Sequence, residues 1–297
     1  MVVDSAVVAD VAGWPRMREP PAGLVSVVEA MTRSAARVVT VGDLARWCGD
    51  EVAARRAVRV LREGGWLVPM RTRGAWRCGV WEFHRTAAFD ELLARLRTHP
   101  ETPAVIAGRS VMEVHGWLKR PTEPTIAMPP GVLVPRCLGG LNLLRWQARA
   151  PVGCVEGLPV WSASTLVAYM AARPARFGFE DAGEWLDAAC SAAAVEEIVS
   201  ELGGRARSVW MKAAFIMWRG EQPEAAAQLA ALAPAGARGP YKFGVPTGRW
   251  AGRTYGDFDV VDYIFERHWE PPDSHFMAWE PHTTDGSSVS SSSQRWG

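Results

Sequence analysis

The 297-residue sequence lacks the features that mark several common classes of protein. No apolar run approaches the roughly 20 residues that a membrane-spanning helix needs. No basic segment followed by an apolar one opens the chain as it would in a secretory signal. The five cysteines are odd in number and widely spaced, without a C-x-x-C pair or a nearby Cys/His group. We therefore expect a soluble, cytoplasmic protein with reduced cysteines and no zinc site.

Motifs of the common enzyme families are missing as well. The sequence contains no Walker phosphate-binding loop, no G-x-G-x-x-G and no G-x-S-x-G, and its six histidines show no H-E-x-x-H or similar spacing. No nucleophile, base and orienting group recur at a recognisable spacing. We expect no catalytic residues, no cofactor and no enzyme activity.

One acidic group is the exception to this pattern. Asp257, Asp259 and Asp262 could chelate a divalent metal if the segment were suitably folded. They lie among apolar residues such as Phe258 and Val260, which favours a helix or strand with a solvated acidic edge. We expect no metal site, and keep a metal-dependent enzyme of nucleic-acid metabolism with a DNA-binding accessory domain as an alternative.

Lysine is absent from one basic region near the N-terminus. The segment from Arg16 to Arg85 contains thirteen arginines and seven acidic residues. This is an excess of six positive charges in a chain whose overall charge is only +1. A basic segment in a chain whose other residues offset its charge is typical of a module that binds a polyanion.

Apolar spacing in this region predicts the order helix, strand, helix, turn, helix and hairpin, which is the order of a winged helix. Thr40-x-x-Asp43 has the form of a capping box that opens the second helix, and Asp50 caps the third. The expected elements are helices at 24–36, 41–48 and 51–63, and strands at 38–40, 66–70 and 75–83.

The third helix is expected to be the DNA-recognition helix. An apolar stripe of Ala54, Ala57, Val58 and Leu61 lies opposite a face rich in arginine. The predicted DNA-contacting residues are Arg55, Arg56, Arg59, Arg62, Arg71, Arg73 and Arg77. Arg55 and Arg56 lie in the first turns, where an arginine offers two parallel donors to guanine, and the others are placed for phosphates or a minor groove. The alternatives are a merely solvated helix face and a protein-docking module.

The chain as a whole is predicted to be α+β, with two domains. We expect an N-terminal arm at 1–22, a winged helix-turn-helix DNA-binding domain at 23–98, a larger mixed α/β domain at 99–282 and a disordered Ser-rich tail at 283–297. In the second domain strands come first, at 105–106, 125–128, 132–134 and 143–148, with a brief helix that Ser110-x-x-Glu113 opens. Helices follow, at 162–171 and as a packed set over 180–233.

Three phrases of the sequence resemble the AbiEi-type antitoxins, the abortive-infection family of type IV toxin-antitoxin systems. They are Val41-Gly-Asp-Leu-Ala45 leading to Arg55-Arg-Ala-Val-Arg-Val-Leu-Arg-Glu-Gly-Gly-Trp-Leu67, then Val105-Ile-Ala-Gly-Arg-Ser-Val-Met-Glu-Val-His-Gly116, and Gly157-Leu-Pro-Val-Trp-Ser162. The resemblance covers about residues 35–175. It implies a winged helix that represses its own operon and a C-terminal domain that antagonises a nucleotidyltransferase toxin. The Ala, Arg and Gly bias indicates a GC-rich genome, as in actinobacteria.

The sequence therefore predicts an antitoxin and transcriptional autorepressor that binds double-stranded DNA in its own promoter. One small winged helix covers too few base pairs to be selective in a genome, so we expect repeated or inverted half-sites, for which a homodimer on DNA is one arrangement. Whether the toxin is contacted directly stays open. The runner-up is a winged-helix regulator whose second domain senses a small molecule.

Overall fold

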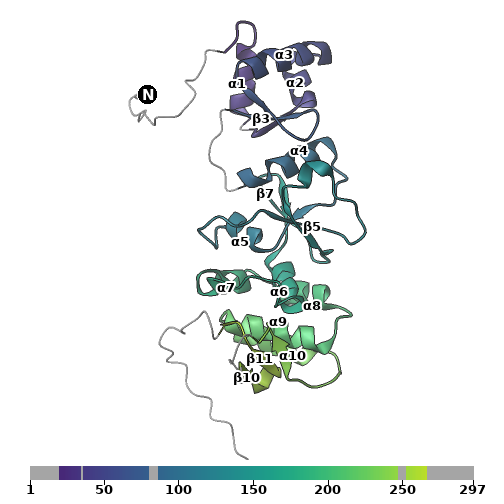
Figure 1. The fold of residues 1–297 in the computed structure, drawn as a ribbon, viewed down its shortest axis with the longest axis vertical. Coiled ribbons are helices and arrows are strands. Elements are labelled where there is room, and N and C mark those ends of the chain that lie inside the picture. Colours follow the sequence, from purple (N-terminus) through teal and green to yellow (C-terminus); the bar gives the residue numbers. More distant parts are fainter. Residues whose placement is uncertain (1–19, 35, 80–85, 247–251, 266–297) are drawn as a thin grey trace, which may run out of the picture.

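The computed structural model describes residues 20–34, 36–79, 86–246 and 252–265. It is an α+β protein with three sheets in this part of the chain, as the sequence predicts. The elements follow one another along the long axis, so three successive tiers can be recognised (Figure 1). Most of the expected arm and the whole Ser-rich tail lie outside the described residues. No helix in the described ranges combines the length and the apolar character needed to cross a membrane.

The first tier holds three helices and a small antiparallel sheet. It comprises α1 (Val25–Arg33), β1 (Val38–Thr40), α2 (Val41–Cys48), α3 (Glu51–Glu63), β2 (Leu67–Pro69) and β3 (Ala75–Cys78). The strand order is β1-β3-β2. These bounds agree with the expected elements, and the last part of the predicted second hairpin strand, 80–83, lies outside the described residues.

Local caps fix the two helices that carry the predicted site. Thr40 and Asp43 form the predicted capping box at the start of α2. Gly49 ends α2 in the left-handed conformation at φ 89°, which favours glycine, and Asp50 then accepts a hydrogen bond from the Ala53 N–H at the start of α3. The chain therefore turns sharply between α2 and α3.

The second tier is built around a mixed five-stranded sheet of order β6-β5-β4-β8-β7. It comprises the short helix η1 (Ala87–Phe89), α4 (Asp90–Thr98), β4 (Val105–Ile106), α5 (Arg109–His115), β5 (Thr125–Met128), η2 (Arg136–Leu138), β6 (Asn142–Arg145), β7 (Gly153–Val155) and β8 (Leu158–Val160). Strand β4 pairs antiparallel with β5 and parallel with β8. Residues from β4, β5 and β8, including Ile106 and Val160, are fully buried.

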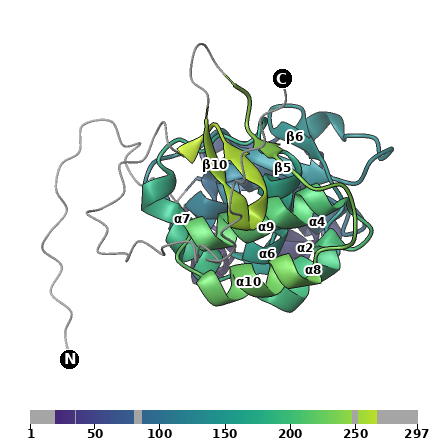
Figure 2. The ribbon, with the colours of Figure 1, turned by 90° about the horizontal axis from the view of Figure 1, so that it is seen from below.

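The third tier is mainly helical, with a small sheet beside α9 (Figure 2). It comprises α6 (Ala163–Ala172), α7 (Ala182–Ser191), α8 (Val195–Leu202), α9 (Arg207–Arg219), α10 (Pro223–Leu232), β9 (Tyr241–Phe243), β10 (Arg253–Tyr255), η3 (Gly256–Phe258) and β11 (Val260–Asp262). Helix α6 is buried almost along its whole length, because it packs against α8 and α9 and lies between them and the sheet of the second tier (Figure 1).

Helix α4 joins the first two tiers. Val38 and Ala75 of the small sheet belong to the same buried cluster as Phe89 and Leu92, which extends into the second and third tiers. Arg37 is buried at this junction and pairs with Glu156 at 2.9 Å and with Asp90 at 3.5 Å. The first tier is therefore held to the rest by apolar packing and by the ion pairs of the buried Arg37.

Three expectations for the second half of the chain are wrong. Residues 132–134 are not a strand, because they follow Pro129-Pro130 in a turn and pair with no strand in the described chain. Ser110 does not cap α5; the helix begins after Gly108, and the Ser110 hydroxyl instead accepts the Thr125 N–H at 3.0 Å. Strands do not all precede the helices, since β9, β10 and β11 follow them.

Candidate nucleic-acid interface

Helix α3 divides into a buried and an exposed face, as its sequence pattern predicts. Ala54, Ala57 and Leu61 are buried in the core of the first tier, and Val58 is half-buried against it. The opposite face leaves Arg55, Arg56, Arg59 and Arg62 exposed. Four arginines of the predicted site therefore share one helix surface.

Two of these arginines pair with acidic residues of the same helix. Arg55 donates to Glu51 at 2.7 Å and Arg59 to Glu63 at 3.1 Å, and all four side chains are exposed. Such exposed pairs contribute only about 0.3 to 0.5 kcal/mol, so a phosphate or a guanine edge can compete for either guanidinium. In the described part of the chain Arg56 and Arg62 have no ion-pair partner. The face is thus available to an anion.

The loop between β2 and β3 is fixed to α4. The Glu91 carboxylate accepts hydrogen bonds from the backbone N–H groups of Arg71 and Thr72, at 2.7 and 3.2 Å, and from the Thr72 hydroxyl at 3.2 Å. Thr72 is buried, whereas the side chains of Arg71 and Arg73 on either side of it are exposed. The loop therefore presents its two arginines from a defined backbone.

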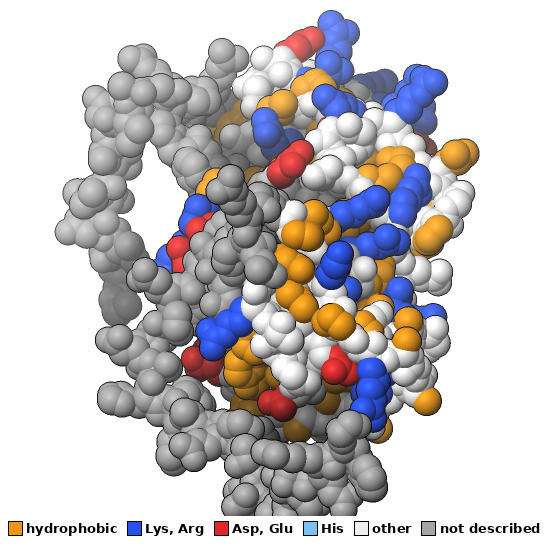
Figure 3. Space-filling view, turned by 60° about the horizontal axis from the view of Figure 1, so that its bottom comes forward, with side chains coloured by type: hydrophobic (Ala, Val, Ile, Leu, Met, Phe, Trp, Pro, Cys, Tyr) orange, Lys and Arg blue, Asp and Glu red, His pale blue; other side chains and the backbone are white. Residues whose placement is uncertain are grey.

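Arg71 and Arg73 line a basic cleft of about 500 Å³ between this loop, α4 and the segment around η2. Arg95 of α4 and Arg136 of η2 line it as well, and none of its lining residues is acidic. Sequence reasoning missed Arg95 and Arg136, because they come from the second tier and only the fold brings them to the loop. Arg77 is exposed on the central strand β3 and is not among the residues of the cleft. Lysine and arginine side chains are spread over the face seen in Figure 3, most of them in its upper and right parts.

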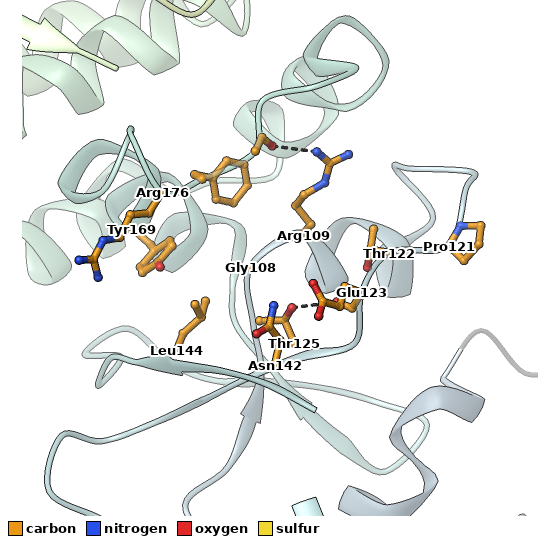
Figure 4. Close-up of a pocket in the computed structure, with 12 residues that line it drawn as sticks. Gly108, Arg109, Pro121, Thr122, Glu123, Thr125, Asn142, Leu144, Tyr169 and Arg176 are labelled. Atoms are coloured by element: carbon orange, nitrogen blue, oxygen red, sulfur yellow. Dashed lines mark hydrogen bonds between the residues drawn. The ribbon is translucent and has the colours of Figure 1, made fainter. Parts of the chain in front are cut away.

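A second pocket, of about 380 Å³, lies where β4 leads into α5 (Figure 4). Gly108 has φ 60° and ψ −141°, a backbone conformation that favours glycine, and a Cβ there would also lie close to Leu144, at 3.3 Å. The Arg109 side chain lines the pocket and donates to the carbonyl of Gly178, which lines it as well, at 3.1 Å. Burial raises the pKa of the Tyr169 phenol, which keeps its hydroxyl protonated.

The motif from Val105 to Gly116, which borders this pocket, serves the fold. Glu113 accepts from the N–H and the hydroxyl of Thr122, each at 2.8 Å, and Ser110 binds the start of β5. Arg109 pairs with Glu180 and, at 3.7 Å, with Asp181, so its charge is offset within the protein. These contacts place the motif at the junction of the second and third tiers and favour no ligand class.

The three aspartates near the C-terminus do not form a metal site. In the described ranges no group of three or more His, Cys, Asp or Glu side chains comes together as a metal ion would require. Asp262 is buried, and its carboxylate accepts the N–H groups of Ile264 and Phe265 at 2.8 and 3.1 Å. Asp259 occupies a turn with φ 51°. The segment is an acidic turn and strand end, and the solvated edge predicted for Asp262 is wrong.

Comparison with solved structures identifies a protein of similar fold. The RV2827C protein from Mycobacterium tuberculosis superposes with a TM-score of 0.64 at 23% sequence identity, over 83% of this chain and 93% of that one. At this identity the likeness shows the fold alone. A scan against models of protein families finds no match, and a search of curated proteins finds none either.

Proposed function

We propose that the chain is a DNA-binding antitoxin and transcriptional autorepressor whose first tier is a winged helix-turn-helix domain. The observation that carries the DNA-binding part is the exposed face of α3, where four arginines follow a sharp turn from α2. In helix-turn-helix proteins the N-terminal turns of the second helix meet base edges in the major groove, and flanking cations meet phosphates. Arg55 and Arg56 occupy those turns, and Arg59 and Arg62 the later ones.

In this proposal the loop between β2 and β3 acts as the wing. Arg71 and Arg73 bind phosphates, and Arg77, exposed on β3, supplements them. A phosphate contact fixes the register of the protein on DNA without reading sequence. The preferred site is the protein's own promoter, where repeated or inverted half-sites bind more than one copy of the chain, as a homodimer or independently.

The antitoxin part of the proposal rests on the resemblance of residues 35–175 to AbiEi-type antitoxins. It assigns the second and third tiers to antagonism of a co-encoded nucleotidyltransferase toxin. Direct contact with the toxin is not part of the proposal, because antagonism could also act on the toxin's substrate.

A small-molecule sensor remains the second candidate, and one observation favours it. A pocket of about 550 Å³ lies between the first tier and α4, lined by Trp47, Leu93 and Arg46 among others. Pockets at such junctions are frequent ligand sites. The metal-dependent enzyme is not favoured by the geometry of the three aspartates. Metal-dependent nuclease or nucleotidyl-transfer activity that disappears with Asp259→Ala would favour it.

A reporter fused to the promoter of the chain's own operon tests the proposal. We expect the wild type to repress the reporter, and Arg55→Ala/Arg56→Ala to lose repression while remaining folded. Arg238→Ala is the matched control, because Arg238 is an exposed arginine between α10 and β9, far along the chain from α3. Repression that the double variant retains in full, or that Arg238→Ala loses equally, contradicts the proposal.

A further inference from the structure

Helix α3 carries an exposed valine in its first turn. Val52 is 61% exposed, the most exposed large apolar residue of the helix, and lies beside the ion pair between Glu51 and Arg55. It has no place in the buried stripe of Ala54, Ala57 and Leu61. The packing of the first tier therefore gives no reason for an apolar side chain at this position.

Val52 lies near the middle of the arginine face. At 100° per residue Val52 lies between the two arginines around the helix axis, about 40° from Arg56 and about 60° from Arg55. The two arginines therefore lie one turn further along the helix, on either side of Val52 around its axis. A helix that enters the major groove by its N-terminal turns brings this valine to the base edges together with the two arginines.

Helix stability does not explain the residue either. A β-branched side chain loses rotamer freedom in a helix, and valine is a weaker helix former than alanine. An acidic residue would interact better with the helix dipole in the first turn. Val52→Ala is therefore expected to fold at least as well as the wild type, so a loss of binding in this variant cannot be attributed to the helix.

We infer that Val52 reads the 5-methyl group of a thymine in the operator. In the major groove the only apolar group that a base edge presents is this methyl, and apolar side chains recognise it by contact. Because Arg55 and Arg56 flank the valine, the thymine lies next to a guanine that one of them binds. The inference rests on the proposed DNA-binding function and adds a residue that specifies one base pair.

Replacement of thymine by uracil in the DNA tests the inference, because it removes only the methyl group. The promoter fragment is prepared with dTTP or with dUTP, and single thymines within the protected site are then replaced in synthetic duplexes. At one thymine per half-site the wild type is expected to lose about fourfold in affinity, the value of one buried methyl. Val52→Ala is expected to bind the thymine and uracil duplexes equally at that position.

Val60→Ala is the matched control. Val60 is also exposed on α3, at 39%, but it lies two turns further along and about 80° around the helix. This variant should keep the wild-type preference for thymine. Equal losses on uracil substitution in the wild type and in Val52→Ala, at every position, overturn the inference while the proposed function stands. A wild type that binds promoter and scrambled duplexes equally contradicts the proposed function, and the role of Val52 with it.

Discussion

Arg97 of α4 donates a hydrogen bond to the carboxylate of Asp43 of α2, with 2.8 Å between Nη2 and Oδ1. Arg97 also donates to the carbonyl of Val38 in β1. Asp43 is the capping-box residue at the start of α2, and its side chain is only 4% exposed. One carboxylate therefore caps the helix that precedes α3 and also ties it to the second tier.

The free energy of unfolding should show this role. Arg97→Gln leaves the buried Asp43 with Arg46 as its only ion-pair partner in the described chain, and we expect a loss of about 1 to 3 kcal/mol. Arg46 pairs with the same oxygen at 2.6 Å but is 72% exposed, so Arg46→Gln should cost at most about 0.5 kcal/mol. Urea unfolding of the two variants measures the difference. Equal losses of unfolding free energy would contradict the proposed role of the Arg97–Asp43 contact.

The proposed function separates two activities on one chain. Arg55→Ala/Arg56→Ala in the full-length protein should abolish promoter binding but still neutralise the co-encoded toxin, because both residues are exposed on α3 in the first tier. Growth rescue on toxin expression is the measurement. If residues 1–98 alone rescue growth, the assignment of antagonism to the later tiers is wrong.

Gly220 is required by a close approach between α9 and α7. It follows α9, and a Cβ there would lie 2.4 Å from Sγ and 2.6 Å from Cβ of Cys190, although its φ of −91° suits any residue. Gly220→Ala should therefore lower the free energy of unfolding by about 1 to 3 kcal/mol. Gly42→Ala in α2, where a Cβ would meet only Thr40 Oγ1 at an ordinary 3.8 Å, should raise it by up to about 1 kcal/mol. Thermal or urea unfolding of the two variants measures both changes, and a Gly220→Ala variant as stable as the wild type would contradict the close approach.

His115 provides a prediction for pH. Its ring stacks on Trp117 at 4.7 Å between centroids, and although the residue is exposed, partial desolvation of the ring lowers its pKa from the ordinary 6.5. The unfolded chain then binds the proton first, so the contribution of this residue to stability is complete above pH 6.5 and declines as the pH falls towards the lower folded value. A titration of the imidazole by NMR should give a pKa below that in urea, and His115→Gln should remove this part of the pH dependence. A folded pKa at or above the unfolded one would show that the ring is not desolvated in this way.

Local signals in the sequence predicted the first tier well. The capping box of Thr40 and Asp43 and the cap at Asp50 involve residues three apart, so they can be recognised without the fold. The same argument fails at Ser110, because its hydroxyl is taken by Thr125 from a neighbouring strand. Strands β9, β10 and β11 have three residues each and are defined by their pairing with one another, which a local sequence pattern does not reveal.

The candidate site divides in the same way. Helical spacing alone places Arg55, Arg56, Arg59 and Arg62 on one exposed face. The same four side chains are exposed in the structure. The cleft at the β2–β3 loop depends on the contact of Glu91 with that loop and on the path of the chain to Arg136. Such a site requires tertiary structure, and arginine content by itself does not reveal it.

The most direct test of the central claim is binding of the promoter fragment and of a scrambled control across a salt series. The wild type, Arg55→Ala and Arg73→Ala are compared. Arg55→Ala should lose about 1 to 3 kcal/mol on the promoter and little on the control, because a base contact carries specificity. Arg73→Ala should weaken both and reduce the log-log salt slope by about one unit, because it loses one phosphate contact. Equal affinity of the wild type for the two fragments at every salt concentration would contradict base reading by the arginine face, and no response to either substitution would show that this face does not bind DNA.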